Sequence, residues 1–345
     1  MGGLSKTGCR ILEGSVERGQ WETLAASASP FHGPTWHEAI QVLGHRSVVL
    51  CTGKPKLTGV LPLVFRRSRL LGRSLVTAPA ANRGGLVAAD EESRVALLRG
   101  AWHLARQLRA SYVEIRDDVA AVPGLDVRQV SDRHVSVEVS LDGGQEHVSR
   151  RIRKRTRRYA RAASRDGFVV EFGRDVVALD TVYAETMRRR GSPRFGRGFF
   201  EAILRAFSER AEVAVVRRGT EIAAADLLVR DGNTQYSLFA GSKADLHSHR
   251  PNDMLVHAEL MRACTLGLQT FDLGRSPAGS SSLQFKRGFG GVVVPLTYSY
   301  LLRSRREPPG MNPEHFPWDV LARLWSNLPE PVADRLGPRL VRHLH

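Results

Sequence analysis

Apolar and polar positions alternate in a way that predicts a strand, a turn and a second strand in the first part of the chain. Residues 47–67, SVVLCTGKPKLTGVLPLVFRR, contain two such apolar runs on either side of Gly53. A helical pattern follows at residues 91–109, and residues 111–117, SYVEIRD, again alternate like a strand. The apolar face expected for the helix consists of Val95, Leu98, Trp102 and Ala105.

The second half of the chain repeats this order. Residues 212–232 read as strand, turn and strand around Gly219, and residues 235–242, QYSLFAGS, read as a further strand. A helix is predicted over residues 251–267, with Met254, Ala258 and Met261 on its apolar face, and a strand over residues 270–274. The two series align at an offset of about 160 residues, which favours two copies of one α/β domain.

A strongly basic segment separates the two series. Nine of the sixteen residues from Arg150 to Arg165 are Arg or Lys. Helical spacing places Ile152, Thr156, Tyr159 and Ala163 on one narrow stripe. We therefore expect one helix over residues 149–165 that docks through this stripe and presents cations to solvent.

Composition narrows the classes of partner. The 345 residues carry 51 Lys and Arg against 35 Asp and Glu, a net charge of +16, which favours anionic partners such as RNA, nucleotide phosphates or an anionic membrane face. Only three cysteines are present, widely spaced, which argues against a disulfide framework or a CxxC metal site. The apolar runs are too short for a transmembrane helix or a signal peptide, so a cytoplasmic protein is expected.

Two motifs near the end of the second series carry a family resemblance. The string TFDLGRSPAGSSSLQFKRGFGG, residues 270–291, contains a D-x-G-R-S piece and an F-K-x-G-F-G piece. This region resembles the second lobe of the Fem-type acyltransferases, and the branch that looks most similar is the FemAB-like proteins of exosortase (PEP-CTERM) systems. The first half agrees in PFHGPTWHEAI and LTGVLPLVF, so the resemblance covers roughly residues 30–303. The coiled-coil arm of some members has no counterpart, which disfavours peptidoglycan cross-bridge synthesis.

The resemblance implies a fold and a domain organisation. Fem-type enzymes are tandem GNAT-fold proteins, so we expect an α/β (α+β) chain with two GNAT-like lobes, each a mixed twisted sheet flanked by helices. The expected boundaries are a first lobe at 1–145, a basic interlobe helix at 146–168, a second lobe with the acyl-transfer site at 169–303, and a Pro-rich tail at 304–345 packed on a lobe.

The resemblance also implies site residues in the second lobe. Lys286 matches the lysine that the family pattern places near the donor carbonyl, where it would stabilise an oxyanion, and Asp272 is its expected catalytic partner. A solvated lysine and an internal Asp272–Arg275 ion pair are the structural alternatives. Expected substrate-binding residues are Arg275, Phe285, Ser242, Asn252 and Tyr236. The basic helix supplies the expected RNA-binding residues Arg150, Arg151, Arg153, Lys154, Arg157, Arg158 and Arg161.

Other chemistries find less support in the sequence. His247, His249 and His257 cluster near one helix start, but they lack a third-ligand pattern, so surface or capping roles are expected and no metal site. The serines at 280–282 have no Ser/His/Asp spacing that would support a covalent nucleophile.

The sequence leaves two candidates for the acyl donor, aminoacyl-tRNA and acyl-CoA. The R/Q-x-x-G-x-G/A loop with which acyl-CoA GNAT enzymes hold pyrophosphate has no clean copy here, which favours aminoacyl-tRNA as co-substrate. The alternative is an acyl-CoA-dependent N-acyltransferase acting on an amino sugar or polysaccharide precursor. A third interpretation is a non-catalytic RNA- or membrane-binding protein on the same scaffold. Expected partners are tRNA and a small-molecule, peptide or cell-envelope amine, with an anionic membrane as a further candidate, and with neither DNA nor a permanently bound cofactor.

Overall fold

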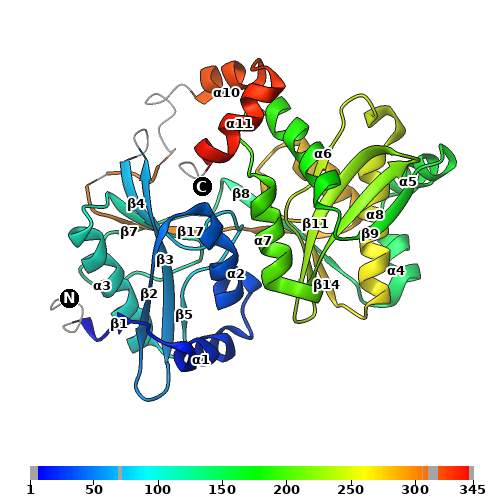
Figure 1. The fold of residues 1–345 in the computed structure, drawn as a ribbon. Coiled ribbons are helices and arrows are strands. Elements are labelled where there is room, and N and C mark those ends of the chain that lie inside the picture. The colour runs from blue at the N-terminus through cyan, green and yellow to red at the C-terminus, as the bar shows by residue number, and fades with distance from the viewer. Residues whose placement is uncertain (1–6, 69–71, 305, 310–317, 342–345) are drawn as a thin grey trace. The chain divides into compact units, whose positions relative to one another are not determined.

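The chain forms two compact units in the computed structural model, which describes residues 7–68, 72–304, 306–309 and 318–341 (Figure 1). The first unit holds the described residues up to Arg133 together with those from Leu296 to Pro309. The second unit holds His134–Pro295 and the described residues from 318 to 341. Each unit is built around its own sheet.

The first unit contains a mixed sheet in the order β1-β2-β3-β4-β6-β17-β7, with β5 paired to β3. All neighbours are antiparallel except β4 and β6, which run parallel. The strands are β1 (Arg10–Ile11), β2 (Arg46–Thr52), β3 (Gly59–Ser68), β4 (Gly72–Val76), β5 (Val87–Ala88), β6 (Tyr112–Ile115), β7 (Val127–Val130) and β17 (Tyr298–Leu302). The helices are α1 (Ser15–Ala25), α2 (Pro34–Ala39) and α3 (Glu91–Gln107), with short 3-10 turns η2 (Pro30–His32) and η3 (Ile40–Leu43).

The second unit contains a sheet in the order β15-β8-β14-β12-β11-β10-β9, with β13 paired to β11 and β16 to β8. Here β12 and β14 are the parallel pair. The strands are β8 (His134–Ser140), β9 (Val169–Gly173), β10 (Ala211–Arg218), β11 (Glu221–Asp231), β12 (Thr234–Ser237), β13 (Gly241–Ser242), β14 (Thr270–Asp272), β15 (Ser276–Pro277) and β16 (Val292–Pro295). The helices are α4 (Gly144–Arg151), α5 (Lys154–Arg165), α6 (Val176–Arg189), α7 (Arg197–Phe207), α8 (Pro251–Thr265), α9 (Ser281–Lys286), α10 (Trp318–Ser326) and α11 (Glu330–Val341), with 3-10 turns η4 (Ser208–Arg210), η5 (His247–His249) and η6 (Arg287–Phe289).

The two units share one succession of elements. A hairpin turning near Gly53 or Gly219 leads to a strand (β4 or β12), a short strand (β5 or β13) and a long helix (α3 or α8). The strand after the helix, β6 or β14, then pairs in parallel with β4 or β12. The predicted α/β class, with two tandem lobes that each have a mixed sheet flanked by helices, is confirmed.

The extents of the units differ from the expected lobes. β17, near residue 300, completes the first sheet between β6 and β7, and β8, which lies before residue 145, belongs to the second sheet. The basic segment is part of the second unit, where α4 and α5 pack on α8. α10 and α11 contact α6, and Arg194 pairs there with Asp180 and, at 2.9 Å, with Asp334 of α11.

The basic segment differs from the single helix expected over residues 149–165. The chain is extended at Ile152 and Arg153, where ψ is 133° and 137°, and this break separates α4 from α5. The Arg153 amide donates to Gly288 O at 2.9 Å, a bond outside the segment that replaces the helical one. The buried face of α5 consists of Thr156, Ala160 and Ala163, so Tyr159, expected on that stripe, is only half-buried.

The buried face of α8 also differs from the expected one. Leu255, Glu259, Leu260 and Ala263 face the sheet, whereas Met254 and Met261 are only partly buried. The pattern was misleading because an acidic residue, Glu259, occupies a core position. None of the described helices is both long and apolar enough to cross a bilayer.

Candidate active site in the second unit

A cavity opens where the parallel strands β12 and β14 part. The two strands pair from Thr234↔Thr270 to Tyr236↔Asp272. Beyond that point Leu238 N donates to Leu227 O, and Leu273 N donates to Val137 O, both at 2.9 Å. Because each strand now follows a different neighbour, the sheet leaves a gap between them. Ligands of open α/β sheets commonly bind at the carboxyl ends of strands in such places.

The cavity has a volume of about 290 Å³ and combines cationic, acidic and apolar groups. Its walls come from the end of α6, strands β11 to β13, the start of α8 and both ends of α9. The residues with functional side chains on these walls include Thr186, Arg189, Arg190, Asp226, Ser242, His247, Asn252, Phe285 and Lys286. Four predicted site residues, Lys286, Phe285, Ser242 and Asn252, are therefore brought together here.

Lys286 is the last residue of α9, a helix that begins at the Ser280 cap, where Oγ accepts a bond of 3.2 Å from Leu283 N. Its Nζ donates to Gly274 O at 2.7 Å and to Arg275 O at 3.0 Å. Burial lowers the pKa of Lys286 to about 8, while the carboxylates of Asp272 and Asp226 act in the opposite direction. An ammonium has three donors, so one remains for a ligand in the cavity.

The glycines of the F-K-x-G-F-G piece hold Lys286 in place through close packing. Gly290 has φ +80°, and a Cβ there would lie 2.7 Å from Arg151 O at the break between α4 and α5. A Cβ at Gly288 would lie 2.8 Å from Thr156 Oγ1. Only glycine allows this approach, so the motif combines a functional lysine with glycines that dock α9 against the basic segment.

Asp272 lies behind the cavity and is not among its lining residues. Its buried carboxylate accepts bonds from Gly274 N, at 2.8 Å, and from Ser136 Oγ. It thereby fixes the turn whose carbonyls at Gly274 and Arg275 hold Lys286. Arg275 contributes that carbonyl, and its positive charge also lies near Lys286 and lowers that residue's pKa. Tyr236, opposite Asp272 in the sheet, is likewise not a lining residue.

Asp226 is a cavity residue that sequence reasoning missed. It is 1% exposed, and its carboxylate accepts bonds from Phe239 N, at 3.1 Å, and from Ser237 Oγ. Burial raises the pKa of Asp226 to about 6, although these bonds and the Lys286 charge act against the rise. The one available signal was a single acid inside the apolar run AAADLLV.

Glu259, on α8, is a second buried acid in this region. It is 1% exposed, and neither carboxyl oxygen has a hydrogen-bond partner among the described residues. Burial, reinforced by the charges of Asp226 and Glu212, raises the pKa of Glu259 well above its usual range. Glu259 is not among the residues that line the cavity, so Asp226 is the carboxylate that the cavity can use.

The predicted residues Ser242 and Asn252 belong to one network with His247. Ser242 Oγ lies 3.0 Å from His247 Nε2 and accepts a bond of 3.1 Å from Asn252 Nδ2. Thr186 Oγ1 accepts from Ser242 N at 2.8 Å and so ties β13 to α6. Burial lowers the pKa of His247, which favours its neutral form. A surface or capping role was expected for His247, whereas it lines the cavity.

The predicted RNA-binding residues fall into two groups. Arg157 donates to the carbonyls of Ser149, Arg150 and Ile152 at 2.6–3.1 Å and so caps the end of α4. Arg150 pairs with Glu146, and Arg151 donates to Ser140 O. The other members are exposed on α5 and its start, without an ion pair among the described residues: Arg153, Lys154, Arg158 and Arg161. This second group presents exposed charge that no acidic side chain among the described residues neutralises. No group of three or more potential metal ligands occurs within the described ranges.

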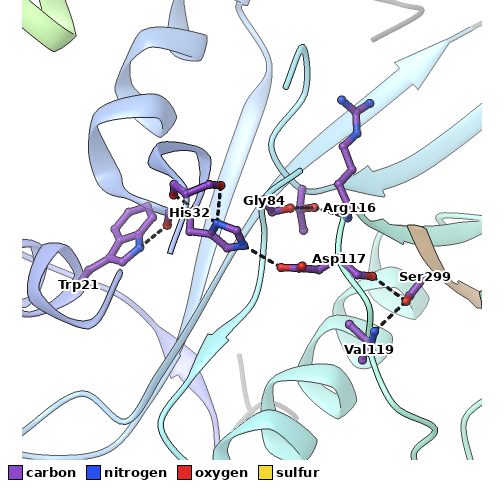
Figure 2. A network of polar contacts seen from close by, with 9 residues as sticks. Trp21, His32, Gly84, Arg116, Asp117, Val119 and Ser299 are labelled. Carbon is purple, nitrogen blue, oxygen red and sulfur yellow. Dashed lines mark hydrogen bonds and ion pairs between the residues drawn. The ribbon is translucent and has the colours of Figure 1, made fainter. Parts of the chain in front are cut away.

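In the first unit, hydrogen bonds within the unit hold the region beyond the carboxyl ends of the parallel strands β4 and β6. Figure 2 shows His32, whose Nε2 lies 2.7 Å from Asp117 Oδ2, and Ser299, whose Oγ donates to Asp117 O and accepts from Val119 N. The buried Arg116 guanidinium donates to Glu114 Oε1 at 3.0 Å and to Ala81 O at 2.6 Å. These bonds join η2, β6 and β17 of the first unit, and we assign no chemistry to them.

Comparison with protein families identifies a domain in the second half of the chain. Residues 149–287 match the family model described as "Acetyltransferase (GNAT) domain", and this range includes every residue of the cavity wall. No curated protein matches the chain.

Solved structures match most of the chain at low sequence identity. FemX has a TM-score of 0.64 and 17% identity over 86% of this chain and 98% of its own. The C-terminal domain of a putative lysylphosphatidylglycerol synthetase from Agrobacterium fabrum has a TM-score of 0.55 and 16% identity, covering 84% and 93%. A tandem GNAT protein of the clavulanic acid biosynthesis pathway has a TM-score of 0.54 and 11% identity, covering 84% and 97%. The chain thus has the tandem GNAT fold of these structures, and residues 149–287, within the second unit, match an acetyltransferase (GNAT) domain.

Proposed function

We propose that this protein transfers an aminoacyl group from aminoacyl-tRNA to an amine of a small molecule, a peptide or a cell-envelope precursor. The observation that carries the proposal is that Lys286 and Asp226 line the same cavity. An acyl transfer to an amine needs a cation or donor for the tetrahedral oxyanion and an acceptor for the proton of the amine. A buried ammonium with a free donor and a buried carboxylate supply these two functions.

In the proposed mechanism the neutral amine attacks the ester carbonyl carbon of the donor. A C–N bond forms, and Lys286 Nζ stabilises the charge that develops on the carbonyl oxygen. Asp226 accepts the proton that the nitrogen releases. The tetrahedral intermediate then collapses with cleavage of the C–O bond, and the leaving ribose oxygen takes up that proton. Atoms and charge therefore balance without a cofactor.

The remaining residues bind and position the substrates. Phe285 forms an apolar wall, and Ser242 and Asn252 offer polar groups at the rim. Arg189 and Arg190 of α6, together with Arg275, provide positive charge for phosphate or carboxylate groups. Asp272 is a positioning residue, because it fixes the turn whose carbonyls hold Lys286. Tyr236 lies opposite Asp272 in the sheet and would support it.

Three features favour tRNA over CoA as the donor. The segment Lys243–Arg250, between β13 and α8, contains no glycine, whereas a pyrophosphate-binding loop uses glycines to expose its backbone amides. The first turn of α8 also carries the buried Asp253, which opposes an anion at this helix start. The exposed cations Arg153, Lys154, Arg158 and Arg161 would bind RNA phosphates. Such a function places the protein in the cytoplasm, where charged tRNA is available.

An acyl-CoA-dependent transfer to an amino sugar or polysaccharide precursor is the second candidate. The family model for residues 149–287 is an acetyltransferase, and the tandem GNAT protein of the clavulanic acid pathway is described in a form without AcCoA. The same Lys286 and Asp226 would serve a thioester as well as an ester. The two candidates differ in the donor and in the acceptor that goes with it.

Parallel binding and turnover measurements test the proposal. Filter binding of tRNA across a salt series, with duplex DNA as competitor, is compared with calorimetric titration of CoA. Salt-sensitive tRNA binding that DNA does not displace, with transfer of a labelled aminoacyl group to an amine, is expected. Micromolar CoA binding without specific tRNA binding would instead establish the second candidate. Vesicles of anionic lipid in the same assay test whether the basic surface prefers a membrane.

A further inference from the structure

Tyr159 is a half-buried aromatic residue that lies among arginines on the surface of α5. The guanidinium of Arg250 lies 4.4 Å from the centre of its ring, and those of Arg155 and Arg158 lie at 5.2 Å and 5.8 Å. Arg155 Nε also donates to Tyr159 Oη at 2.5 Å, which fixes the ring. We call these four residues the Tyr159 cluster. Flat aromatic and guanidinium groups held in this way are surfaces on which unpaired nucleobases stack.

The Tyr159 cluster adjoins the rim of the cavity through the segment before α8. Arg250 is the N-cap residue of α8 and has left-handed backbone angles, with φ 60°. On either side of it in the chain, His247 and Asn252 line the cavity. Since consecutive Cα atoms are 3.8 Å apart, the backbone of Arg250 is at most about 8 Å from that of Asn252. A contact of 2.7 Å between His249 Nδ1 and Asp166 Oδ2 joins this segment to the end of α5.

Exposed cations flank the Tyr159 cluster along α5. Lys154 and Arg161 are exposed and have no ion pair among the described residues. Positive side chains beside a stacking platform are the combination with which proteins hold single strands, because the charges contact phosphates while the rings contact bases. Lys154 and Arg161 thus lie on the same helix as Tyr159, and Arg250 joins this cluster to the segment whose residues line the cavity.

We propose that the Tyr159 cluster is a binding site for an unpaired nucleobase at the single-stranded 3′ end of the RNA donor. The inference rests on the proposed function for the identity of the donor and adds a site to it. Stacking on Tyr159 and Arg250 holds the strand so that its terminal ribose ester enters the cavity toward Lys286. The cations of α5 contact the phosphates that precede this base.

The test compares two labelled RNA hairpins by fluorescence anisotropy with the full chain. One hairpin carries a short single-stranded tail that ends in CCA, and the other is blunt. The Tyr159→Ala substitution should weaken binding of the tailed hairpin about tenfold, the scale of one lost stacking contact, and leave the blunt hairpin unaffected. Tyr159→Phe keeps the ring and should bind as wild type. Arg250→Lys keeps the charge but loses the flat guanidinium, so it should also weaken the tailed hairpin selectively.

Arg205→Ala is the matched control, because it removes one exposed cation on α7, away from the Tyr159 cluster. Tailed and blunt hairpins that both bind Tyr159→Ala as they bind wild type would overturn the stacking site and leave the tRNA donor standing. An equal loss for both hairpins would also overturn it, since that result marks a general effect on charge or folding. A wild-type chain that binds neither hairpin, but binds CoA, removes the proposed function and the inference together.

Discussion

At the scale of single residues, burial lowers the pKa of Lys286 and raises that of Asp226, so that both pKa values lie closer to neutral pH. The pKa of the lysine falls to about 8, and that of the aspartate rises to about 6. Between these values the ammonium can stabilise an oxyanion while the carboxylate can accept a proton. The cavity is therefore competent in a window around pH 7.

A bell-shaped dependence of kcat on pH is the first prediction. Asp226 must be ionised to accept a proton, so kcat should rise as pH passes about 6, and Lys286 must be protonated, so kcat should fall as pH passes about 8. Asp226→Asn should lower kcat by about a hundredfold or more and remove the acidic limb. Initial rates at saturating substrate across pH measure this. If the acidic limb persists in Asp226→Asn, that limb reports the titration of another group.

Loss of the Lys286 ammonium is the second prediction. Lys286→Ala should lower the rate of a single turnover by about a hundredfold or more, which is the scale for one oxyanion donor. Lys243→Ala, nearby but outside the cavity wall, is the control and should retain the wild-type rate. Circular dichroism should be the same for both variants. Full activity of Lys286→Ala with the true donor would remove Lys286 from the mechanism.

The sequence predicted those cavity residues that belong to a recognisable motif or to the segment expected to lie beside that motif. Lys286 and Phe285 came from the F-K-x-G-F-G piece, and Ser242 and Asn252 from the region before α8. Asp226 and His247 were missed because nothing local distinguishes them. An acid within an apolar strand and a histidine within a turn acquire their roles only when β12 and β14 part and α8 packs beside them.

At the scale of elements, the break between α4 and α5 depends on a contact that no local pattern contains. The Arg153 amide bonds to Gly288 O, in a distant part of the sequence, and the extended backbone buries Ile152. Local helical spacing therefore predicted one helix and placed Tyr159 on its buried stripe. By contrast, the extent of α3 was predicted well, although Val95 and Trp102, expected on its apolar face, are only partly buried and that face also contains Leu97, Ala101 and Leu104.

A pair of glycine substitutions gives the third prediction. Gly290 and Gly279 have similar positive φ values of +80° and +75°, but a Cβ at Gly290 meets Arg151 O at 2.7 Å, whereas one at Gly279 meets nothing within 4 Å. Gly279→Ala should cost about 1 kcal/mol through backbone strain alone. Gly290→Ala should cost about 2 kcal/mol more, because it forces η6 away from the α4–α5 break.

Thermal unfolding measures the difference between these two variants. Gly290→Ala should unfold several degrees below Gly279→Ala. It should also lose activity, because η6 holds the end of α9 and thus Lys286. Equal unfolding temperatures would show that the close approach at Gly290 contributes nothing.

At the scale of the whole molecule, the positions of the charged residues matter more for binding a specific polyanion than the net charge of +16 does. A chain-wide excess attracts any polyanion, whereas Arg153, Lys154, Arg158 and Arg161 form one exposed row on α5 and at its start. Arg157, counted among the RNA-binding residues by sequence, instead caps α4, so its removal would confuse binding with folding.

The fourth prediction concerns the salt dependence of tRNA binding. Replacing the four row residues by Ala should flatten the slope of log K against log salt by about one unit per lost phosphate contact. The matched control replaces Arg99, Arg106, Arg109 and Arg205, which are exposed and lie on or beside α3 and α7. This control has the same net charge and should keep the wild-type slope. Equal slopes for the two variants would indicate generic attraction.

The tandem organisation was predicted because the order of elements repeats at a nearly constant offset. The assignment of single strands to sheets was harder. β8 and β17 join sheets far from where their sequence position suggested, because strand pairing is decided by long-range hydrogen bonds.

The position of β17 has a consequence for the order of events during synthesis. This strand lies between β6 and β7, so it is an internal strand of the first sheet, yet the ribosome makes it after all the strands of the second sheet. A nascent chain that has reached Pro295 holds every strand of the second sheet while β7 still lacks its neighbour. The part of the chain that is made first is therefore finished last, and a premature stop near residue 296 would leave the first sheet open at β6.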